Sequence, residues 1–224
     1  MTLLDLPYFD IIFEKCVLPH LDLNSLSQLS LVSSEFNSLV LEYLSDLRCL
    51  KIPLHFKKLL KDHHIANIAL ATGSLRVLDL SGCSEAVTNE TLCALLLQND
   101  EVTTLDISRC NKITPSAFSD LSLKGFFSLS DPLAKLEHLI ADDCSALTGE
   151  VGAYLSNTNL KTLSLGGSLP ILTTDDNTVR EITKHLPHLE NINLSKCYKI
   201  TNASMKCVSY IILYIYYIIL YESM

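Results

Sequence analysis

Residues 75–83 read LRVLDLSGC, and the same spacing of apolar residues is repeated along the chain. The other copies are VTTLDISRC at 102–110, LEHLIADDC at 136–144, LKTLSLGGS at 160–168 and LENINLSKC at 189–197. Their starts at 75, 102, 136, 160 and 189 are separated by 27, 34, 24 and 29 residues, and the longest step indicates an insertion near 124–132. Repeats of about this length are typical of solenoids, in which each unit buries its apolar face only against its neighbours.

Each repeat combines a short strand with a short helix. The Leu-x-Leu core alternates with a period of two, which indicates a strand with one buried face. After the first copy, Leu92, Leu95 and Leu96 have the spacing of one face of a helix. Thr88 and Thr201 precede two of these helical segments, and threonine is a favourable helix N-cap. The sequence therefore predicts an α/β solenoid with short parallel strands inside and helices outside.

The pattern resembles the cysteine-containing class of leucine-rich repeats, which is found in many F-box proteins. Four copies end in a cysteine, namely Cys83, Cys110, Cys144 and Cys197. These cysteines could be metal ligands or a redox set. Alternatively, each is a small buried side chain that caps its repeat, and together they form a ladder, since stacked strands lie about 4.8 Å apart. Ser168 at the same position of another copy favours the second interpretation. We predict neither a metal nor a cofactor.

The segment 1–45 carries no repeat and is predicted to be helical, because its apolar residues recur at spacings of three and four. This segment resembles an F-box. The matching pieces are LP at 6–7, DII at 10–12, LDL at 21–23 and LSLVSSEF at 29–36. The last piece is the most specific. At VLPH, residues 17–20, the chain resembles the F-box pattern with a short insertion. The predicted solenoid is therefore preceded by a small all-α segment.

An F-box followed by leucine-rich repeats is the order found in substrate receptors of Skp–cullin–F-box ubiquitin ligases. The resemblance implies a Skp-type adaptor, and through it a cullin, as partners, with an unidentified target protein bound by the repeats. It assigns adaptor contacts to Leu6, Pro7, Ile11, Leu31, Val32 and Phe36. The alternative is a leucine-rich-repeat scaffold or regulator in which the segment 1–45 only caps the solenoid, because repeat arrays need end caps to remain soluble.

Four parts are expected along the chain. They are the F-box-like segment 1–45, a linker with a degenerate first repeat at 46–74, the repeats at 75–207 and an apolar tail at 208–224. A helix with a basic face is predicted over 57–65. The tail is uncharged from Val208 to Tyr221, whereas a membrane span needs about 20 apolar residues. We interpret the tail as a truncated or mis-predicted end; a weak membrane anchor and a strand or helix capping the solenoid are the alternatives.

The composition excludes several classes of protein. With 48% hydrophobic and 19% charged residues, the chain has the balance of a folded protein. A net charge of -8 argues against a nucleic-acid partner. The N-terminus has neither the basic stretch nor the long apolar stretch of a secretory signal, so we expect the cytoplasm or the nucleus. No local catalytic motif is present, and we predict a non-catalytic subunit.

The concave face of the solenoid is the predicted target-binding surface. It is formed by the variable positions beside the central apolar residue of each strand. The residues expected to contact the target are Asp79, Asp106, His138, Ile140, Asn191 and Asn193. The row is polar and mildly acidic, so it suits a basic or polar partner. The alternative is an ordinary solvated face, with binding elsewhere, for instance on the insertion at 124–132.

Overall fold

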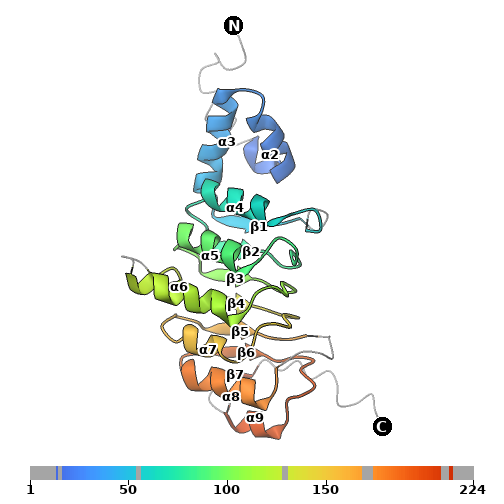
Figure 1. Cartoon of the computed structure of the whole chain (residues 1–224), viewed down its shortest axis with the longest axis vertical. Coiled ribbons are helices and arrows are strands. Elements are labelled where there is room, and N and C mark those ends of the chain that lie inside the picture. The colour runs from blue at the N-terminus through green and yellow to red at the C-terminus, as the bar shows by residue number, and fades with distance from the viewer. Residues whose placement is uncertain are drawn as a thin grey trace.

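The protein is an elongated stack of repeats with one parallel sheet running along its length (Figure 1). A computed structural model describes residues 14, 17–53, 57–127, 131–167, 174–207 and 212–213. The strands are β1 (Cys49–Lys51), β2 (Val77–Asp79), β3 (Thr104–Asp106), β4 (His138–Ile140), β5 (Thr162–Ser164), β6 (Asn191–Asn193) and β7 (Ile212–Leu213). Their order in the sheet is their order in the sequence, so the predicted leucine-rich-repeat solenoid is confirmed.

The register of the sheet is the same at every step. The central residues pair along the sheet as Leu50 with Leu78, Leu78 with Leu105, Leu105 with Leu139, Leu139 with Leu163 and Leu163 with Ile192. Each strand from β2 to β6 begins two residues after the start of its sequence repeat. The 34-residue step therefore leaves the strand pairing unchanged, and its additional residues lie between the strands.

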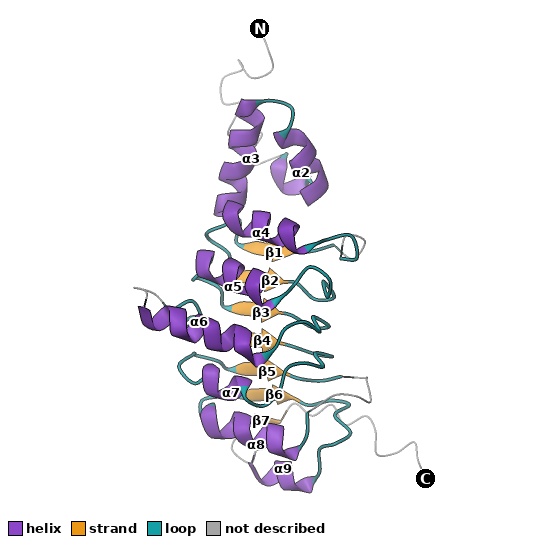
Figure 2. Ribbon diagram, in the orientation of Figure 1, coloured by secondary structure: helices purple, strands orange, loops and turns teal. Residues whose placement is uncertain are grey.

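The helices lie on one side of the strand layer (Figure 2). They are α4 (Asp62–Ala71), α5 (Asn89–Gln98), α6 (Pro115–Phe127), α7 (Val151–Tyr154), α8 (Asp176–His185) and α9 (Asn202–Cys207). The leucines that recur in each repeat fill the space between the strands and the helices. Leu78, Leu105 and Leu139 are fully buried there. Thr88 caps α5, because its side-chain oxygen accepts a hydrogen bond from the backbone N–H of Thr91, as the sequence predicts.

The structure changes one expectation for the linker and describes two residues of the tail. The helix predicted over 57–65 is wrong in its limits, because residues 57–59 form a turn and α4 begins at Asp62. The side chain of His64 accepts the backbone N–H of Lys61, which fixes this start. In the tail, only Ile212–Leu213 is described, and it pairs with β6 as a further parallel strand. Among the described residues, no helix has the length and apolar character needed to cross a membrane.

The turn after each strand has a shared geometry. The residue just before the cysteine position has a positive φ in four repeats: 74° at Gly82, 62° at Arg109, 58° at Asp143 and 60° at Lys196. Three residues before Gly82, Arg109 and Lys196, the side chains of Asp79, Asp106 and Asn193 each accept a hydrogen bond from the backbone N–H of the serine two positions ahead, at 2.9–3.0 Å. These turns direct the chain away from the strand at the same point in each repeat.

The cysteines connect neighbouring repeats. The thiols of Cys110, Cys144 and Cys197 donate to the carbonyls of Leu80, Ile107 and Leu165, at 3.3, 3.1 and 3.2 Å. Each acceptor lies in the preceding repeat, so the cysteine does more than cap its own repeat. Burial raises the pKa of the Cys83, Cys144 and Cys197 thiols to about 11 and raises that of Cys110 as well. Ser168 lies outside the described residues.

We expect the raised thiol pKa values to make the protein less stable in alkali. A thiol whose pKa rises on folding stabilises the fold below its ordinary pKa, and this contribution is lost as the pH rises through the folded-state pKa. For Cys144 the window runs from 9.0 to about 11. The free energy of unfolding in urea, measured from pH 8 to 11, should fall by roughly 1–2 kcal/mol more in the wild type than in Cys144→Ala. Parallel pH profiles would contradict this account.

Candidate functional site

The N-terminal helical segment has a small core of its own. It contains a 3-10 turn (Leu18–His20) and the helices α2 (Leu23–Ser30) and α3 (Ser34–Asp46). Asp22 and Ser33 cap the two helices by accepting the backbone N–H groups of Ser25 and Phe36. The core consists of Leu18, Leu26 and Val40, with Leu21, Leu29, Tyr43 and Leu44 packed around it. This cluster is separate from the main core, which begins at Leu50.

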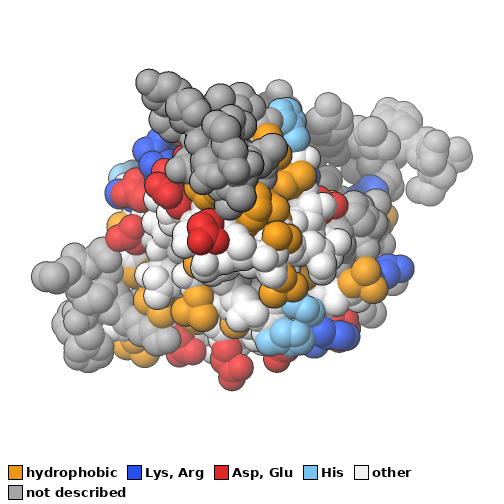
Figure 3. Space-filling view, turned by 90° about the horizontal axis from the view of Figure 1, so that it is seen from above, with side chains coloured by type: hydrophobic (Ala, Val, Ile, Leu, Met, Phe, Trp, Pro, Cys, Tyr) orange, Lys and Arg blue, Asp and Glu red, His pale blue; other side chains and the backbone are white. Residues whose placement is uncertain are grey.

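The turn between α2 and α3 exposes two adjacent apolar side chains. Leu31 is 76% exposed and Val32 is 67% exposed. Figure 3 looks at this end of the molecule and shows hydrophobic side chains on its surface. Phe36 is half-buried in the first turn of α3. The other residues predicted to contact an adaptor, Leu6, Pro7 and Ile11, lie outside the described residues.

The six residues predicted to bind a target lie on one face of the sheet. In their strands, the central residue is buried, whereas Asp79, Asp106, His138, Ile140, Asn191 and Asn193 are half-buried. The structure thus places them on the same face, on β2, β3, β4 and β6 with β5 between the last two; these six residues are hereafter the concave row. Asp79, Asp106 and Asn193 also accept backbone hydrogen bonds in the turns that end their strands, a role that the sequence pattern does not predict.

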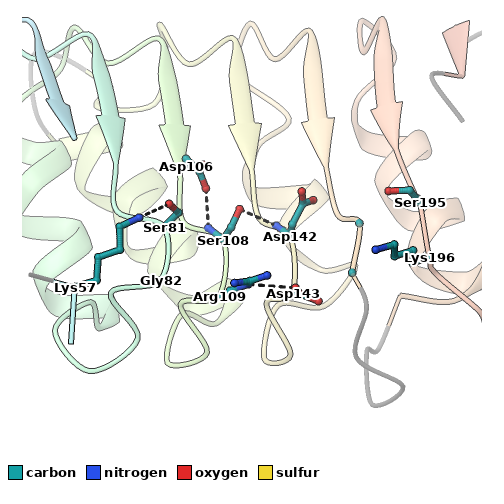
Figure 4. A pocket seen from close by; sticks show the side chains of 12 residues that line it. Lys57, Ser81, Gly82, Asp106, Ser108, Arg109, Asp142, Asp143, Ser195 and Lys196 are labelled. Atoms are coloured by element: carbon teal, nitrogen blue, oxygen red, sulfur yellow. Dashed lines mark hydrogen bonds and ion pairs between the residues drawn. The ribbon is translucent and has the colours of Figure 1, made fainter. Parts of the chain in front are cut away.

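A polar groove of about 390 Å³ lies at the carboxyl ends of the strands and continues this row. Its basic side chains are Lys57, Arg109 and Lys196, which come from the loops after β1, β3 and β6 (Figure 4). Its acidic side chains are Asp106, Asp142 and Asp143. The basic side chains were not predicted from the sequence. The available signal was their recurrence, since Arg109 and Lys196 occupy the same position of the repeat as Gly82.

Asp142 is the acidic residue with the most unusual environment. Burial raises its pKa, and the nearby carboxylates of Asp106 and Asp143 act in the same direction. Ser164 opposes this effect by donating a hydrogen bond of 2.5 Å from its hydroxyl to the Asp142 carboxylate. Asn193 in turn donates to the Ser164 hydroxyl at 2.8 Å. The carboxylate is therefore fixed in position by two neighbouring repeats.

The carboxylates of this surface differ in their ion pairs. Lys51 pairs with Asp79 at 3.4 Å, and Arg109 pairs with Asp143 at 3.4 Å. Burial alone would raise the pKa of Asp79, but hydrogen bonds from Ser81 and the charge of Lys57 lower it. Among the described residues, no ion pair is formed by Asp106 or Asp142. The surface thus holds two carboxylates that a basic side chain of another protein can pair with.

The described residues contain no group of three or more His, Cys, Asp or Glu side chains placed to hold a metal ion. The groove is polar, and it can form hydrogen bonds and ion pairs through its three basic and three acidic side chains.

No protein-family model matches the chain. Among solved structures, the chain is similar to one in the crystal structure of the Rad7 and Elc1 complex in yeast, with a TM-score of 0.51 and 22% sequence identity. The similarity covers 63% of this chain and 34% of that one, so the chain spans about a third of its relative. At this identity the likeness concerns the fold, and it agrees with an α/β solenoid of leucine-rich-repeat type.

Proposed function

We propose that this chain is the substrate-recognition subunit of a Skp–cullin–F-box type ubiquitin ligase in the cytoplasm or nucleus. Its N-terminal helices bind the adaptor, its repeats bind a target protein, and the complex promotes proteasomal degradation of that target. The chain itself contributes binding and orientation, and the transfer chemistry belongs to other subunits. The likeness to a chain crystallised in complex with Elc1 is in keeping with a repeat protein that acts within an assembly.

The observation that carries this proposal is the exposed pair Leu31 and Val32 on a helical unit with its own core. A segment that only capped the solenoid would direct its apolar side chains towards the first repeat. Here the small core closes on itself, and two large apolar side chains remain in water at the far end of the segment. Exposed apolar pairs on a packed scaffold are typical of docking sites, which favours adaptor binding over the cap alternative.

The target is proposed to bind along the concave row and the groove beside it. Asp106 and Asp142 are the acidic anchors, because neither has an ion-pair partner within the described part of the chain. A basic segment would neutralise them, whereas His138, Ile140, Asn191 and Asn193 supply polar and apolar contacts beside it. The target is therefore expected to present lysine or arginine to this surface.

Adaptor binding is tested by a pull-down of the full chain with a purified Skp-type adaptor. The double variant Leu31→Asp/Val32→Asp should lower the affinity at least tenfold, because it places two charges in an apolar contact. The matched control is Leu59→Asp, which changes a leucine that is 68% exposed but lies in the loop after β1. This control variant should bind as well as the wild type.

Two results would contradict the proposal. The first is a folded wild-type chain that does not bind the adaptor, which would leave a leucine-rich-repeat scaffold as the better account. The second is equal loss of binding in both variants, which would show that the α2–α3 turn is not the contact. Circular dichroism of each variant distinguishes these outcomes from a failure to fold.

A further inference from the structure

Three successive helices on the outer side of the solenoid carry an exposed leucine at the same position. Leu70, Leu97 and Leu123 are each the ninth residue of α4, α5 and α6, and they are 80%, 38% and 58% exposed. The helices pack side by side in this order (Figure 2). The three leucines therefore form one row across the outer surface, hereafter the outer leucine row.

The fold does not require leucine at this position. The ninth residue of α8 is Lys184, whose side chain is well exposed. In α5 the two preceding leucines, Leu95 and Leu96, are fully buried and already fill the core. Since a single exposed leucine is ordinary but an aligned row is not, the outer leucine row has the character of a contact surface.

The residues one turn before each leucine are short. They are Asn67, Ala94 and Asp120, so the longer leucine side chains protrude beyond their neighbours on the helix surface. Packed helices lie about 8–10 Å apart, and the row therefore spans roughly 16–20 Å. A helix rises about 1.5 Å per residue, so a partner helix of about 11–13 residues would cover it.

The charges on the helices that carry the row define the partner further. Helices α4, α5 and α6 contain the acidic residues Asp62, Glu90 and Asp120 against one basic residue, Lys124. All three acidic residues are exposed. A second copy of the chain would bring like charges together over the leucines, whereas a partner with lysine or arginine beside its apolar face would pair with them.

We propose that the outer leucine row is a docking surface for a basic amphipathic helix of another protein. Its apolar face covers Leu70, Leu97 and Leu123, and its lysine or arginine side chains pair with Asp120, one turn before Leu123, and with Glu90, two turns before Leu97. This surface faces away from the concave row, so a target and this helix can be bound at the same time. The inference does not depend on the proposed ligase function.

The experiment uses two labelled synthetic peptides of about 14 residues with the same leucine face, one flanked by lysines and the other by glutamates. Fluorescence anisotropy with the full chain should show binding of the lysine peptide at least tenfold tighter than binding of the glutamate peptide. The triple variant Leu70→Lys/Leu97→Lys/Leu123→Lys should lower that affinity at least tenfold. It should fold, because α8 already carries lysine at this position.

A second variant separates the apolar contribution from the charge contribution. Glu90→Lys/Asp120→Lys keeps the leucines and should reverse the preference, so that the glutamate peptide binds more tightly. The control variant Leu31→Asp/Val32→Asp should bind both peptides as the wild type does. Equal affinity of the wild type and the triple variant for the lysine peptide, or no binding of that peptide, would overturn the proposal. Dimerisation of the wild type that the triple variant abolishes would also overturn it, in favour of a second copy.

Discussion

Replacing Phe118 with alanine is expected to lower the free energy of unfolding by about 3–5 kcal/mol. Phe118 lies in α6 and is fully buried, as are its neighbours Ala117 and Leu121. Because α6 packs between α5 and α7, the phenylalanine fills space in the middle of the stack. Its removal leaves a cavity that neighbouring repeats cannot close without shifting the sheet, so both the lost burial and the cavity contribute.

Urea unfolding of wild type and Phe118→Ala, followed by circular dichroism, measures this loss. The matched control is Leu123→Ala on the same helix, which removes an exposed side chain and should change the free energy by less than about 0.5 kcal/mol. A loss below about 1 kcal/mol for Phe118→Ala would mean that α6 does not pack against the sheet as described.

Replacing Asn99 with leucine is expected to cost about 2–4 kcal/mol, because it leaves buried polar groups without partners. Asn99 is completely buried at the end of α5. Its side-chain oxygen accepts the backbone N–H of Leu75 at 3.1 Å, and its amide donates to the Thr72 hydroxyl at 3.1 Å and to the Leu95 carbonyl at 2.9 Å. One side chain thus joins α5 to the segment between α4 and β2.

The same unfolding measurement applies. The control is Asn157→Leu, which makes the same substitution at an exposed position. Hydrogen exchange gives a second readout, because the Leu75 amide should lose its protection in Asn99→Leu. A variant as stable as the wild type, with the Leu75 amide still protected, would refute the role assigned to Asn99.

The fold could be predicted because its decisive signal is local and repeated. Leu78, Leu105 and Leu139 recur with the same apolar neighbours, and each becomes the central residue of a strand. The cysteines could be recognised as structural on the same ground, although their hydrogen bonds to the preceding repeat could not. Those bonds depend on how the repeats stack, which a single copy of the pattern does not contain.

The site could be predicted only in part. The face that carries Asp106 and Ile140 follows from the period of two in a strand. The groove does not, because Lys57 and Arg109 reach it from loops whose course depends on the whole stack. Asn99 was missed for a related reason: a polar residue after a helix has the appearance of a surface residue, and only the packing of the preceding repeat buries it.

The constant strand register determines which changes of sequence such a protein can accept. Residue insertions between strands alter neither the order nor the spacing of the side chains on the concave face, as the 34-residue step between repeats demonstrates. Each strand supplies its own side chains to that face, so a substitution at Ile140 or Asn191 alters the face at one place only. The length of a repeat can therefore vary on the helix side while the side chains of the strand face vary one at a time, and the two kinds of change are independent.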